Sequence, residues 1–270
     1  MYYISTNTGK EILNMPVYIE SSQNSLYKHI KKLQTKSGRS KNSQYLAEGV
    51  RAVVDAVSNG ADIECAVVKK SSDISVDLPD KKIYVMEDSL FDSLKTTVNS
   101  QGILAVINYE VFSSDDMDVR DFETIIYLDS VTDPGNMGTI IRSSDALGAD
   151  AIVISKGCVD IFNPKVVRSS MASLLNVPIF TDDAPLKTFE KLKNSGFEIV
   201  GTFPDAQENS RDAEYGEKTV LVMGNEANGI SEEIENLCTR RVTIPMKGRA
   251  ESLNVATAMS IMLYEISVRK

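Results

Sequence analysis

The chain has 270 residues, a formal net charge of −9, and 42% hydrophobic and 25% charged side chains. This length allows one large or two modest domains with buried cores, and the ordinary composition indicates a globular protein. No apolar run approaches the length of a membrane span, and the N-terminal residues MYYISTNTGK lack a charged-then-apolar signal pattern, so we expect a cytoplasmic protein.

Histidine and cysteine are scarce in this chain. The only histidine, His29, lies among lysines in KHIKK, which argues against Ser-His-Asp or Cys-His catalysis because both need a histidine base. Cys65, Cys158 and Cys238 are far apart, so they predict reduced thiols, and they lack the close ligand pairs of a zinc site. We therefore expect chemistry that uses neither histidine nor a bound metal.

The first 110 residues predict a small α/β domain. Their patterns predict strands at 17–19, 45–47, 63–68, 82–85 and 103–107, and helices at 24–33, 48–58 and 89–96. Residues 38–44 (GRSKNSQ) predict a polar, basic loop. Residues 111–121 contain the polar and acidic run SSDDMD and predict a linker, after which a second domain spans residues 122–270.

A basic segment stands out in this first part. Residues 1–110 have a net charge of zero and residues 111–270 a net charge of −9, yet residues 28–41 carry no acid. Their basic side chains are Lys28, Lys31, Lys32, Lys36, Arg39 and Lys41. A solvated helix face and a contact surface for an anionic partner are equally good interpretations of this segment.

The second part alternates strands and helices. Strands are predicted at 124–128, 151–154, 198–202, 220–223 and 242–244, and helices at 138–147, 164–175, 186–195, 231–237 and 255–268. Such alternation predicts an α/β fold with a parallel sheet. The last helix is apolar on two sides, which predicts either a subunit interface or a deep core position.

Three loops follow predicted strands of this sheet. Loop one is Thr132–Asn136, loop two is Met223–Gly229 and loop three is Pro245–Asn254. The carboxyl ends of strands in an open α/β sheet face one crevice, where ligands bind. We therefore expect five polar side chains in or just after these loops to converge: Asn136, Arg142, Glu226, Ser252 and Asn254.

Each of these side chains also has a purely structural interpretation. Asn136 lies where the N-cap of the following helix is expected, and Ser252 or Asn254 would cap the last helix. Glu226 would be a solvated loop acid. Arg142 is harder to explain as a surface residue, because its neighbours along the helix are apolar. Three loops in one layer predict a ligand site, but not which ligand.

Familiar nucleotide-binding loops are absent from the sequence. No G-x-G-x-x-G follows a strand and no glycine-rich loop ends in G-K-[ST], which excludes a dinucleotide Rossmann site and a P-loop. Gly224 and Gly229 still permit close approach of a ligand to the backbone. Apolar side chains suited to an adenine ring would line such a site: Met223, Ile244, Met246 and Leu253.

Three segments occur in a distinctive order: DPGNMGTIIRSSDALG, VMGNEANGIS and IPMKGRAESLNVATAMSIMLYE. They resemble the three motifs of the SpoU (TrmH-type) branch of the SPOUT RNA methyltransferases, and NPKVVRSSMASLLNVPIF resembles the family segment between the first two. Together they cover most of residues 124–270. Through IESSQN and YLAEGVRAV, the first 110 residues are similar to the substrate-binding domain that precedes the catalytic domain in many members.

The resemblance implies transfer of a methyl group from S-adenosylmethionine to a ribose 2′-hydroxyl of RNA. It also implies a parallel-sheet SPOUT domain with a C-terminal trefoil knot, preceded by a small α/β RNA-binding domain. General topology rules would not propose a knot. Family members are homodimers, which would account for the two-sided apolar last helix.

The resemblance further implies roles for individual residues. Asn136 and Arg142 match the active site of the first motif, Glu226 that of the second, and Ser252 and Asn254 that of the third. The expected cofactor contacts are Gly224, Ile244, Leu253, Met223, Met246 and Thr202. The expected RNA contacts are Lys28, Lys31, Lys32, Arg39, Lys41 and Arg168. Two departures affect fine positioning: Ala172 replaces a common glycine, and Ser144 replaces a common alanine.

The implied chemistry needs little covalent machinery. Methyl transfer from a sulfonium is an in-line displacement, to which orientation can contribute roughly 7–11 kcal/mol of barrier reduction. The family account makes Arg142 the activator, or the base, of the 2′-hydroxyl. Deprotonating a guanidinium at neutral pH costs roughly 7 kcal/mol, which favours bidentate positioning of the hydroxyl and the adjacent phosphate.

Large-subunit ribosomal RNA is our first expectation for the substrate and tRNA the second. The main alternative is a non-catalytic RNA-binding or ribosome-assembly factor that retains the fold, and the five polar side chains of the loops argue against it. A metabolic enzyme with a nucleotide cofactor is disfavoured by the missing loop fingerprints and by the basic segment.

Overall fold

The computed structural model describes residues 2–5, 17–78, 82–96 and 100–268. The chain divides into two units. Unit 1 comprises Met1–Glu110 and Phe162–Leu175, and unit 2 comprises Val111–Ile161 and Asn176–Lys270. The division near residue 110 lies close to the predicted domain boundary. Residues 162–175, however, belong to unit 1, although the sequence places them in the second domain.

Unit 1 is built on a five-stranded sheet with the order β2-β6-β4-β7-β3. These strands are Val17–Ile19 (β2), Lys82–Met86 (β6), Ile63–Lys69 (β4), Ile103–Asn108 (β7) and Gln44–Glu48 (β3). Strand β7 is antiparallel to both neighbours, and β2, β6 and β4 are parallel. A separate parallel pair joins Tyr2–Ser5 (β1) to Ile74–Asp77 (β5), which the sequence analysis did not predict.

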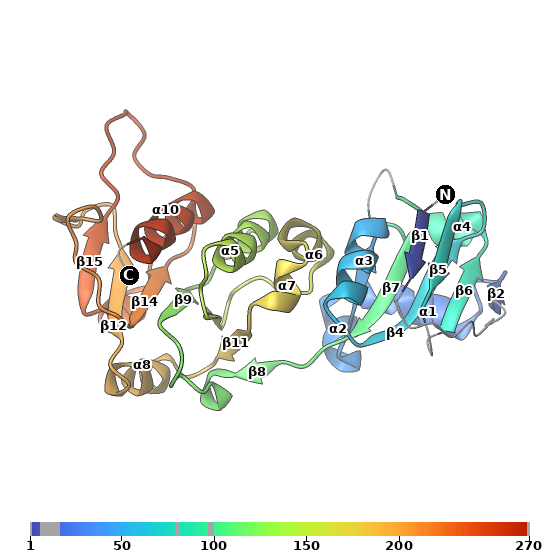
Figure 1. Ribbon diagram of the computed structural model, residues 1–270, viewed down its shortest axis with the longest axis horizontal. Helices are drawn as coiled ribbons and strands as arrows, with labels where there is room; N and C mark the ends of the chain where they lie inside the picture. Colours follow the sequence, from blue (N-terminus) through green and yellow to red (C-terminus); the bar gives the residue numbers. More distant parts are fainter. Residues whose placement is uncertain (1, 6–16, 79–81, 97–99, 269–270) are drawn as a thin grey trace. The chain divides into compact units, whose positions relative to one another are not determined.

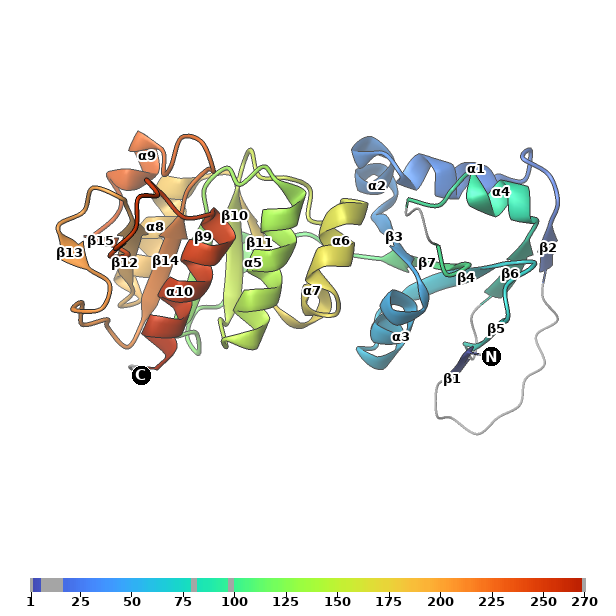
Figure 2. The same cartoon turned by 90° about the horizontal axis from the view of Figure 1, so that it is seen from above.

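Helices cover both faces of this sheet (Figure 2). Helices α1 (Ser25–Leu33) and α4 (Asp88–Asp92) pack on one face through Ile30, Leu33 and Phe91, and α3 (Val50–Ser58) packs on the other. The loop predicted at residues 38–44 is wrong, because Lys36–Asn42 forms helix α2. Its Thr35 N-cap accepts a hydrogen bond from the Gly38 amide, and this local cap outweighs the polar composition.

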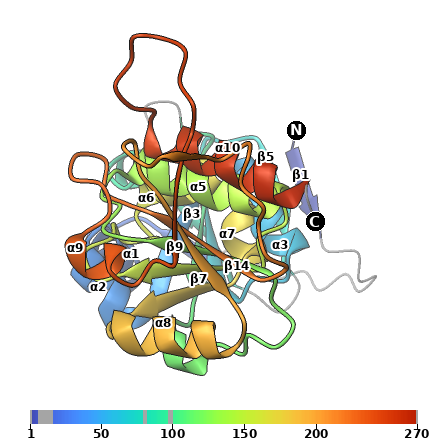
Figure 3. The ribbon, with the colours of Figure 1, turned by 90° about the vertical axis from the view of Figure 1, so that its left-hand side faces the viewer.

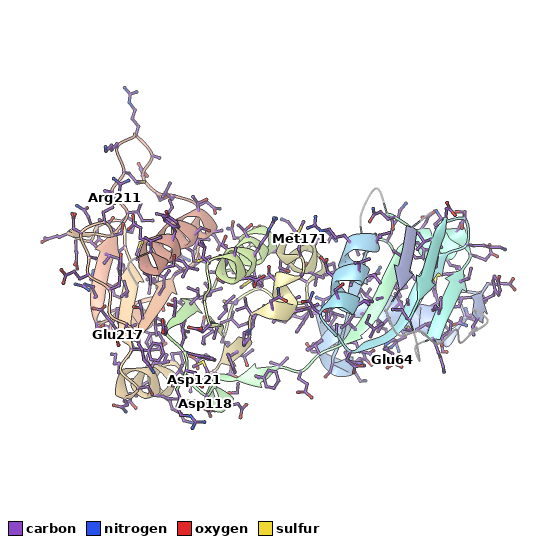
Figure 4. The ribbon with its side chains drawn as sticks, viewed as in Figure 1. Glu64, Asp118, Asp121, Met171, Arg211 and Glu217 are labelled. Atoms are coloured by element: carbon purple, nitrogen blue, oxygen red, sulfur yellow. The ribbon has the colours of Figure 1, made fainter. Side chains whose placement is uncertain are left out.

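The segment 162–175 completes unit 1. The helix predicted at 164–175 is interrupted: α6 (Pro164–Ser170) ends at Met171, whose φ of 54° is left-handed, and α7 (Ser173–Asn176) follows. Met171 is labelled in Figure 4. The ring of Phe162 stacks on Tyr109 at a centroid distance of 3.7 Å, which anchors the start of this segment.

Unit 2 is built on a sheet of eight parallel strands with the order β13-β15-β12-β14-β9-β10-β11-β8, as the predicted parallel sheet requires. The strands are Phe112–Ser113 (β8), Thr124–Leu128 (β9), Ala151–Ser155 (β10), Ile179–Asp182 (β11), Glu198–Thr202 (β12), Glu208–Asn209 (β13), Thr219–Met223 (β14) and Arg240–Thr243 (β15). Strands β8, β11 and β13 were not predicted from the sequence. Strand β8 and the 3-10 helix η1 (Ser114–Asp116) lie within the predicted linker.

Helices α5 (Pro134–Ala146) and α10 (Val255–Ser267) lie side by side on one face of this sheet, and α8 (Pro185–Asn194) lies on the other (Figures 1 and 3). Helix α9 (Glu232–Glu235) contributes Ile234 to the core on the α8 face. The Ser260 hydroxyl of α10 donates to Ser143 of α5 at 2.8 Å. The central strands β9, β10 and β14 are buried on both faces, which explains their continuous apolar runs.

One side of α10 is a core position, as one of the two alternatives for the last helix expected. Met259, Met262 and Ile266 are fully buried, whereas Tyr264 is 57% exposed. No helix in the described part of the chain is long and apolar enough to cross a membrane. The trefoil knot that the resemblance implies stays a prediction.

Candidate functional site

Loops two and three border one cavity in unit 2. Its volume is about 240 Å³, and its walls come from the end of β12, from loop two, from loop three and from the first turn of α10. All six residues expected to contact a cofactor line it: Thr202, Met223, Gly224, Ile244, Met246 and Leu253. Among the five expected catalytic residues, Glu226 and Ser252 also line the cavity.

Asn136 and Asn254 do not line this cavity, but a chain of hydrogen bonds connects them to Glu226, which does. The Asn254 side-chain amide donates to Asn136 Oδ1 at 2.8 Å, and the Asn136 amide donates to Glu226 Oε1 at 3.0 Å. Asn254 Oδ1 in turn accepts from the first amides of α10, so Asn254 is the N-cap of that helix. One residue from each loop therefore joins a single polar network at the rim of the cavity.

The expected N-cap role of Asn136 is wrong. Helix α5 begins at Pro134, and its N-cap is Asp133, whose Oδ1 accepts from the Asn136 amide nitrogen at 2.8 Å. Proline suits the first helical position because its missing amide hydrogen would have no partner there. The helix therefore starts four residues earlier than predicted, and the Asn136 side chain is free to bind Glu226.

Glu226 is held by backbone and side-chain donors of loop one. Its Oε1 accepts from the Asp133 amide at 3.1 Å, and its Oε2 accepts from the amide and the hydroxyl of Thr132, each at 3.3 Å. Desolvation raises the pKa of this carboxyl, but the hydrogen bonds from Asn136 and from backbone amides outweigh it and hold the pKa below its usual value. An ionised acid with both oxygens engaged suits positioning better than proton abstraction.

Arg142 lies apart from this network. It follows Asn136 by six residues, or roughly 9 Å along the axis of α5. Its side chain is exposed, and no hydrogen bond or ion pair ties it to any residue that the structure describes. The apolar neighbours that made it conspicuous, Ile140 and Ile141, are fully buried on the other side of the helix. The Arg142 guanidinium therefore keeps its donors available for a ligand.

Asn225 and Phe203 are residues of the site that no sequence prediction singled out. Asn225 donates from its side chain to the Ser130 carbonyl at 2.8 Å, and its Oδ1 accepts two amides of loop two. Phe203 lines the cavity beside Thr202, and the Arg241 guanidinium covers its ring at 3.9 Å. Asn225 directly precedes Glu226, so its place in the loop was the available signal. Phe203 follows a strand end without any motif, and no sequence signal marks it.

The lining residues fit S-adenosylmethionine, the cofactor that the resemblance implies. The Thr202 hydroxyl oxygen is buried and has no hydrogen-bond partner in the described part of the protein, so a ligand atom would satisfy it. Gly224 lines the cavity, and a Cβ atom there would overlap the backbone of Gly229 and Ile230. The backbone of loop two is therefore tightly packed at this wall of the cavity. Ile244 and Leu253 supply the apolar contacts that an adenine ring needs. Among the described residues, no group of three His, Cys, Asp or Glu side chains is placed to hold a metal ion.

The basic segment forms the corner between α1 and α2 in unit 1. Lys28, Lys31, Lys32 and Lys41 are exposed there, as is Lys36. Arg39 is different, and its expected RNA contact is not supported. Its side chain is 3% exposed, and its Nη1 donates to the carbonyls of Leu33 and Gln34. Arg39 therefore satisfies the end of α1, where carbonyl groups lack helical partners.

Arg168 is half-buried in α6 of unit 1. Its Nη1 donates to the Thr96 hydroxyl at 2.7 Å, and its side chain helps to line two hollows of that unit. One of its donors therefore already stabilises the fold. The structure leaves its expected RNA contact as a prediction.

Comparison with known proteins places both parts of the chain. Residues 123–264 match the family model described as the SpoU rRNA Methylase family, and residues 24–105 match the one described as the MRM3-like substrate binding domain. The 23S rRNA (guanosine-2′-O)-methyltransferase RlmP of Bacillus subtilis is 31% identical over 249 residues, which cover 92% of this chain and 98% of that protein.

Two solved structures with 28% identity have the same fold. The AdoMet-bound rRNA methyltransferase from Sinorhizobium meliloti superposes with a TM-score of 0.81 and covers 92% of this chain and 96% of its own. The SpoU methyltransferase AviRb from Streptomyces viridochromogenes, in complex with AdoMet, superposes with a TM-score of 0.82 and covers 92% and 98%. These similarities extend over both units of the chain.

Proposed function

The chain belongs to the SpoU rRNA Methylase family and transfers a methyl group from S-adenosylmethionine to a ribose 2′-hydroxyl of RNA, and we propose that its substrate is large-subunit ribosomal RNA. The observation that carries the assignment to this site is the cavity whose rim joins Asn136, Glu226 and Asn254 in one network. The 23S rRNA substrate printed in the name of the Bacillus subtilis relative supports this choice, and tRNA is the second candidate.

The residues of the cavity have separate roles in this proposal. When bound, S-adenosylmethionine supplies an electrophilic methyl group. Gly224, Ile244 and Leu253, with Met223, Met246 and Thr202, hold the cofactor. Asn136, Glu226, Ser252 and Asn254 form the polar rim that receives the ribose. Arg142 orients the 2′-hydroxyl and the adjacent phosphate bidentately, and this orientation contributes more than any proton transfer by the guanidinium.

We propose that unit 1 binds the substrate RNA. In this proposal, residues 1–110 form the RNA-binding domain and residues 122–270 form the catalytic domain. The match of residues 24–105 to a substrate-binding family supports this division. Lys28, Lys31, Lys32 and Lys41, with Lys36 and Arg168, would contact phosphates and give affinity without sequence information. Such contacts need exposed cations, which the α1–α2 corner provides.

Replacing Lys31 and Lys32 together by alanine is expected to weaken RNA binding most at low salt. Each lost phosphate contact removes about 0.7–0.9 from the slope of log affinity against log salt, so the slope should fall by about 1.5. Fluorescence anisotropy with labelled ribosomal RNA fragments between low and high salt measures it. The control removes the same charge from α8, by replacing exposed Lys187 and Lys193. Equal slopes for both variants would exclude the corner as an RNA surface.

A homodimer and a cytoplasmic location complete the proposal. The exposed apolar side chains of Tyr264 and Val268, at 57% and 59% exposure, lie on the side of α10 that its own chain leaves uncovered. A second copy that covered this side would satisfy the other interpretation of the last helix. An RNA substrate in the ribosome is consistent with the cytoplasm.

The substrate is tested by methyl transfer. Purified protein is incubated with radiolabelled S-adenosylmethionine and, separately, with large-subunit rRNA, small-subunit rRNA and tRNA from cells that lack this protein. We expect label in large-subunit rRNA, recovered as a dinucleotide that resists alkaline hydrolysis because the 2′-hydroxyl is blocked. Label in tRNA alone would replace the proposed substrate. Cofactor binding without label in any RNA would favour the non-catalytic RNA-binding alternative.

A further inference from the structure

A buried carboxylate lies beneath the site and has no role in the proposal above. Asp129 directly follows β9, the strand between β14 and β10, and its amide donates to the Met223 carbonyl at 2.8 Å. The residue is 5% exposed. In the described part of the chain, no lysine or arginine forms an ion pair with it. Burying an unpaired carboxylate is unfavourable, so its hydrogen bonds must compensate.

Three segments donate hydrogen bonds to this carboxylate. The Ser231 amide, just after loop two, donates to Oδ2 at 2.7 Å. The hydroxyl of Ser155, at the end of β10, and that of Ser130, just before loop one, each donate to Oδ1 at 3.3 Å. The Ser130 amide also donates to the Ser155 hydroxyl at 3.0 Å. One side chain thus contacts the ends of two strands and the exit of loop two.

A second hydrogen bond also runs from loop two to the segment before loop one. The Ser130 carbonyl accepts from the Asn225 side chain at 2.8 Å, and Ser130 has a φ of 57°, a left-handed conformation that non-glycine residues seldom adopt. Loop two is therefore fixed to the segment just before loop one, through Asn225 within the loop and through Ser231 just after it. Gly224 and Glu226, which line the cavity, belong to this fixed loop.

We propose that Asp129 is a positioning residue, which fixes loop two against loop one and thereby sets the cofactor wall at Gly224 and the Glu226–Asn136 contact. Asp129 contacts neither the cavity nor the network at its rim, so it acts through Ser231 and Ser130. This inference rests on the proposed function of the cavity. We expect Asp129 to act through hydrogen-bond geometry and not through its charge. An asparagine at this position could still accept from the Ser231 amide and donate to the two hydroxyls.

Asp182 provides a matched control. It is the last residue of β11 and is 1% exposed. Its carboxylate accepts from the hydroxyls of Tyr127, Ser114 and Thr188 and from the Ala184 amide. It contacts none of the three loops. Asp129→Ala and Asp182→Ala should both lower the melting temperature, because each leaves buried donors without an acceptor.

Of these two aspartates, only Asp129 should affect cofactor binding and methyl transfer when it is replaced. For Asp129→Ala we expect cofactor affinity, measured by calorimetry, to fall about tenfold and the single-turnover rate of methyl transfer about 100-fold, since displacements near 1 Å are costly. Asp129→Asn should restore both to within about threefold, because its oxygen and amide satisfy the same partners. Asp182→Ala should leave both unchanged when expressed per folded protein.

A second variant breaks the same hydrogen bond from its other end. Ser231→Pro removes the amide hydrogen, and the Ser231 φ of −65° already suits proline. It should reproduce the losses of Asp129→Ala even if that variant folds poorly. Wild-type rates in Asp129→Ala or Ser231→Pro would overturn the inference, as would equal losses in Asp129→Asn and Asp129→Ala. A wild-type protein that binds no S-adenosylmethionine would instead contradict the proposed function, before any variant is compared.

Discussion

The Gly224→Ala variant is expected to lose S-adenosylmethionine binding by at least about 100-fold, or roughly 2.7 kcal/mol. A Cβ atom at this position would overlap the carbonyl group of Gly229 and the amide nitrogen of Ile230. Both are backbone atoms, so no side-chain rotation relieves the overlap. Asn225 and Gly229 are joined by two backbone hydrogen bonds of 2.8 and 2.9 Å, and the added carbon must force this hairpin open.

The effect of the added carbon is confined to loop two, which lines the cavity. Opening the hairpin moves the apolar and amide groups of loop two, and it moves Glu226 away from Thr132 and Asp133. Isothermal calorimetry with S-adenosylmethionine measures the loss, and thermal unfolding checks that the variant is folded. Gly248→Ala is the matched control, because Gly248 lies in exposed loop three and a Cβ there meets no atom within 4 Å. Wild-type affinity in Gly224→Ala would mean that the cofactor does not use this wall.

The Arg142→Ala variant is expected to bind S-adenosylmethionine normally but to transfer the methyl group about 10²–10³ times more slowly, the usual cost of removing one oriented donor. Arg142 does not line the cofactor cavity, which explains the unchanged affinity. Its exposed guanidinium has no protein partner among the described residues, so its removal leaves no buried group unsatisfied. Single-turnover assays with saturating RNA separate this loss from weaker RNA binding.

Two further variants sharpen the test of Arg142. Arg142→Lys keeps the charge but loses the planar fork, so a bidentate positioning role predicts a rate near that of Arg142→Ala. Arg120→Ala is the control, because Arg120 precedes β9, at the end of the strands opposite the loops, and its guanidinium pairs with nearby Asp118. An unchanged rate in Arg142→Ala would assign this residue to the surface and leave the ribose to the polar rim alone. Full activity in Arg142→Lys would favour a simple charge effect over bidentate positioning.

Loop three borders the cavity and is exposed along its whole length. Figure 1 shows this segment rising from the body of unit 2 between β15 and α10, and in Figure 4 its side chains project away from the sheet. Residues 245–254 are all exposed, including Leu253 at 37% and Met246 at 39%. Exposed apolar side chains at a cavity rim gain from covering a ligand. We therefore expect cofactor binding to bury apolar surface of Met246 and Leu253 that is exposed to water in this structure.

The periodic parts of the sequence predicted the fold well. Strands at 124–128 and 198–202 agree residue for residue with β9 and β12, because β9 (TIIYL) is almost entirely apolar and β12 (EIVGT) has a short buried centre. Some short or weakly apolar strands were not predicted. Strand β8 has two residues, and β11 (IFTD) is short and ends in a buried aspartate. Their pairing depends on neighbouring strands and not on their own pattern.

The sequence by itself determined the parallel sheet, the three loops and the family, because strand periodicity and motif order are local properties of the chain. The six residues that it predicted to contact the cofactor all line the cavity. Only the tertiary structure decided how the polar residues combine. Asn136 reaches Glu226 across 90 residues and Asn254 across 118, because β14 pairs with β9 and α10 packs on α5.

The same distinction separates Arg39 from Arg142. Both are arginines in basic or conspicuous segments, and composition cannot tell them apart. Packing places Arg39 at the end of α1, where its guanidinium satisfies two carbonyls, and leaves Arg142 exposed on α5. A buried cation must find acceptors in the fold, whereas an exposed one keeps its donors for a ligand. Long-range packing decides which of these occurs, and no local pattern encodes it.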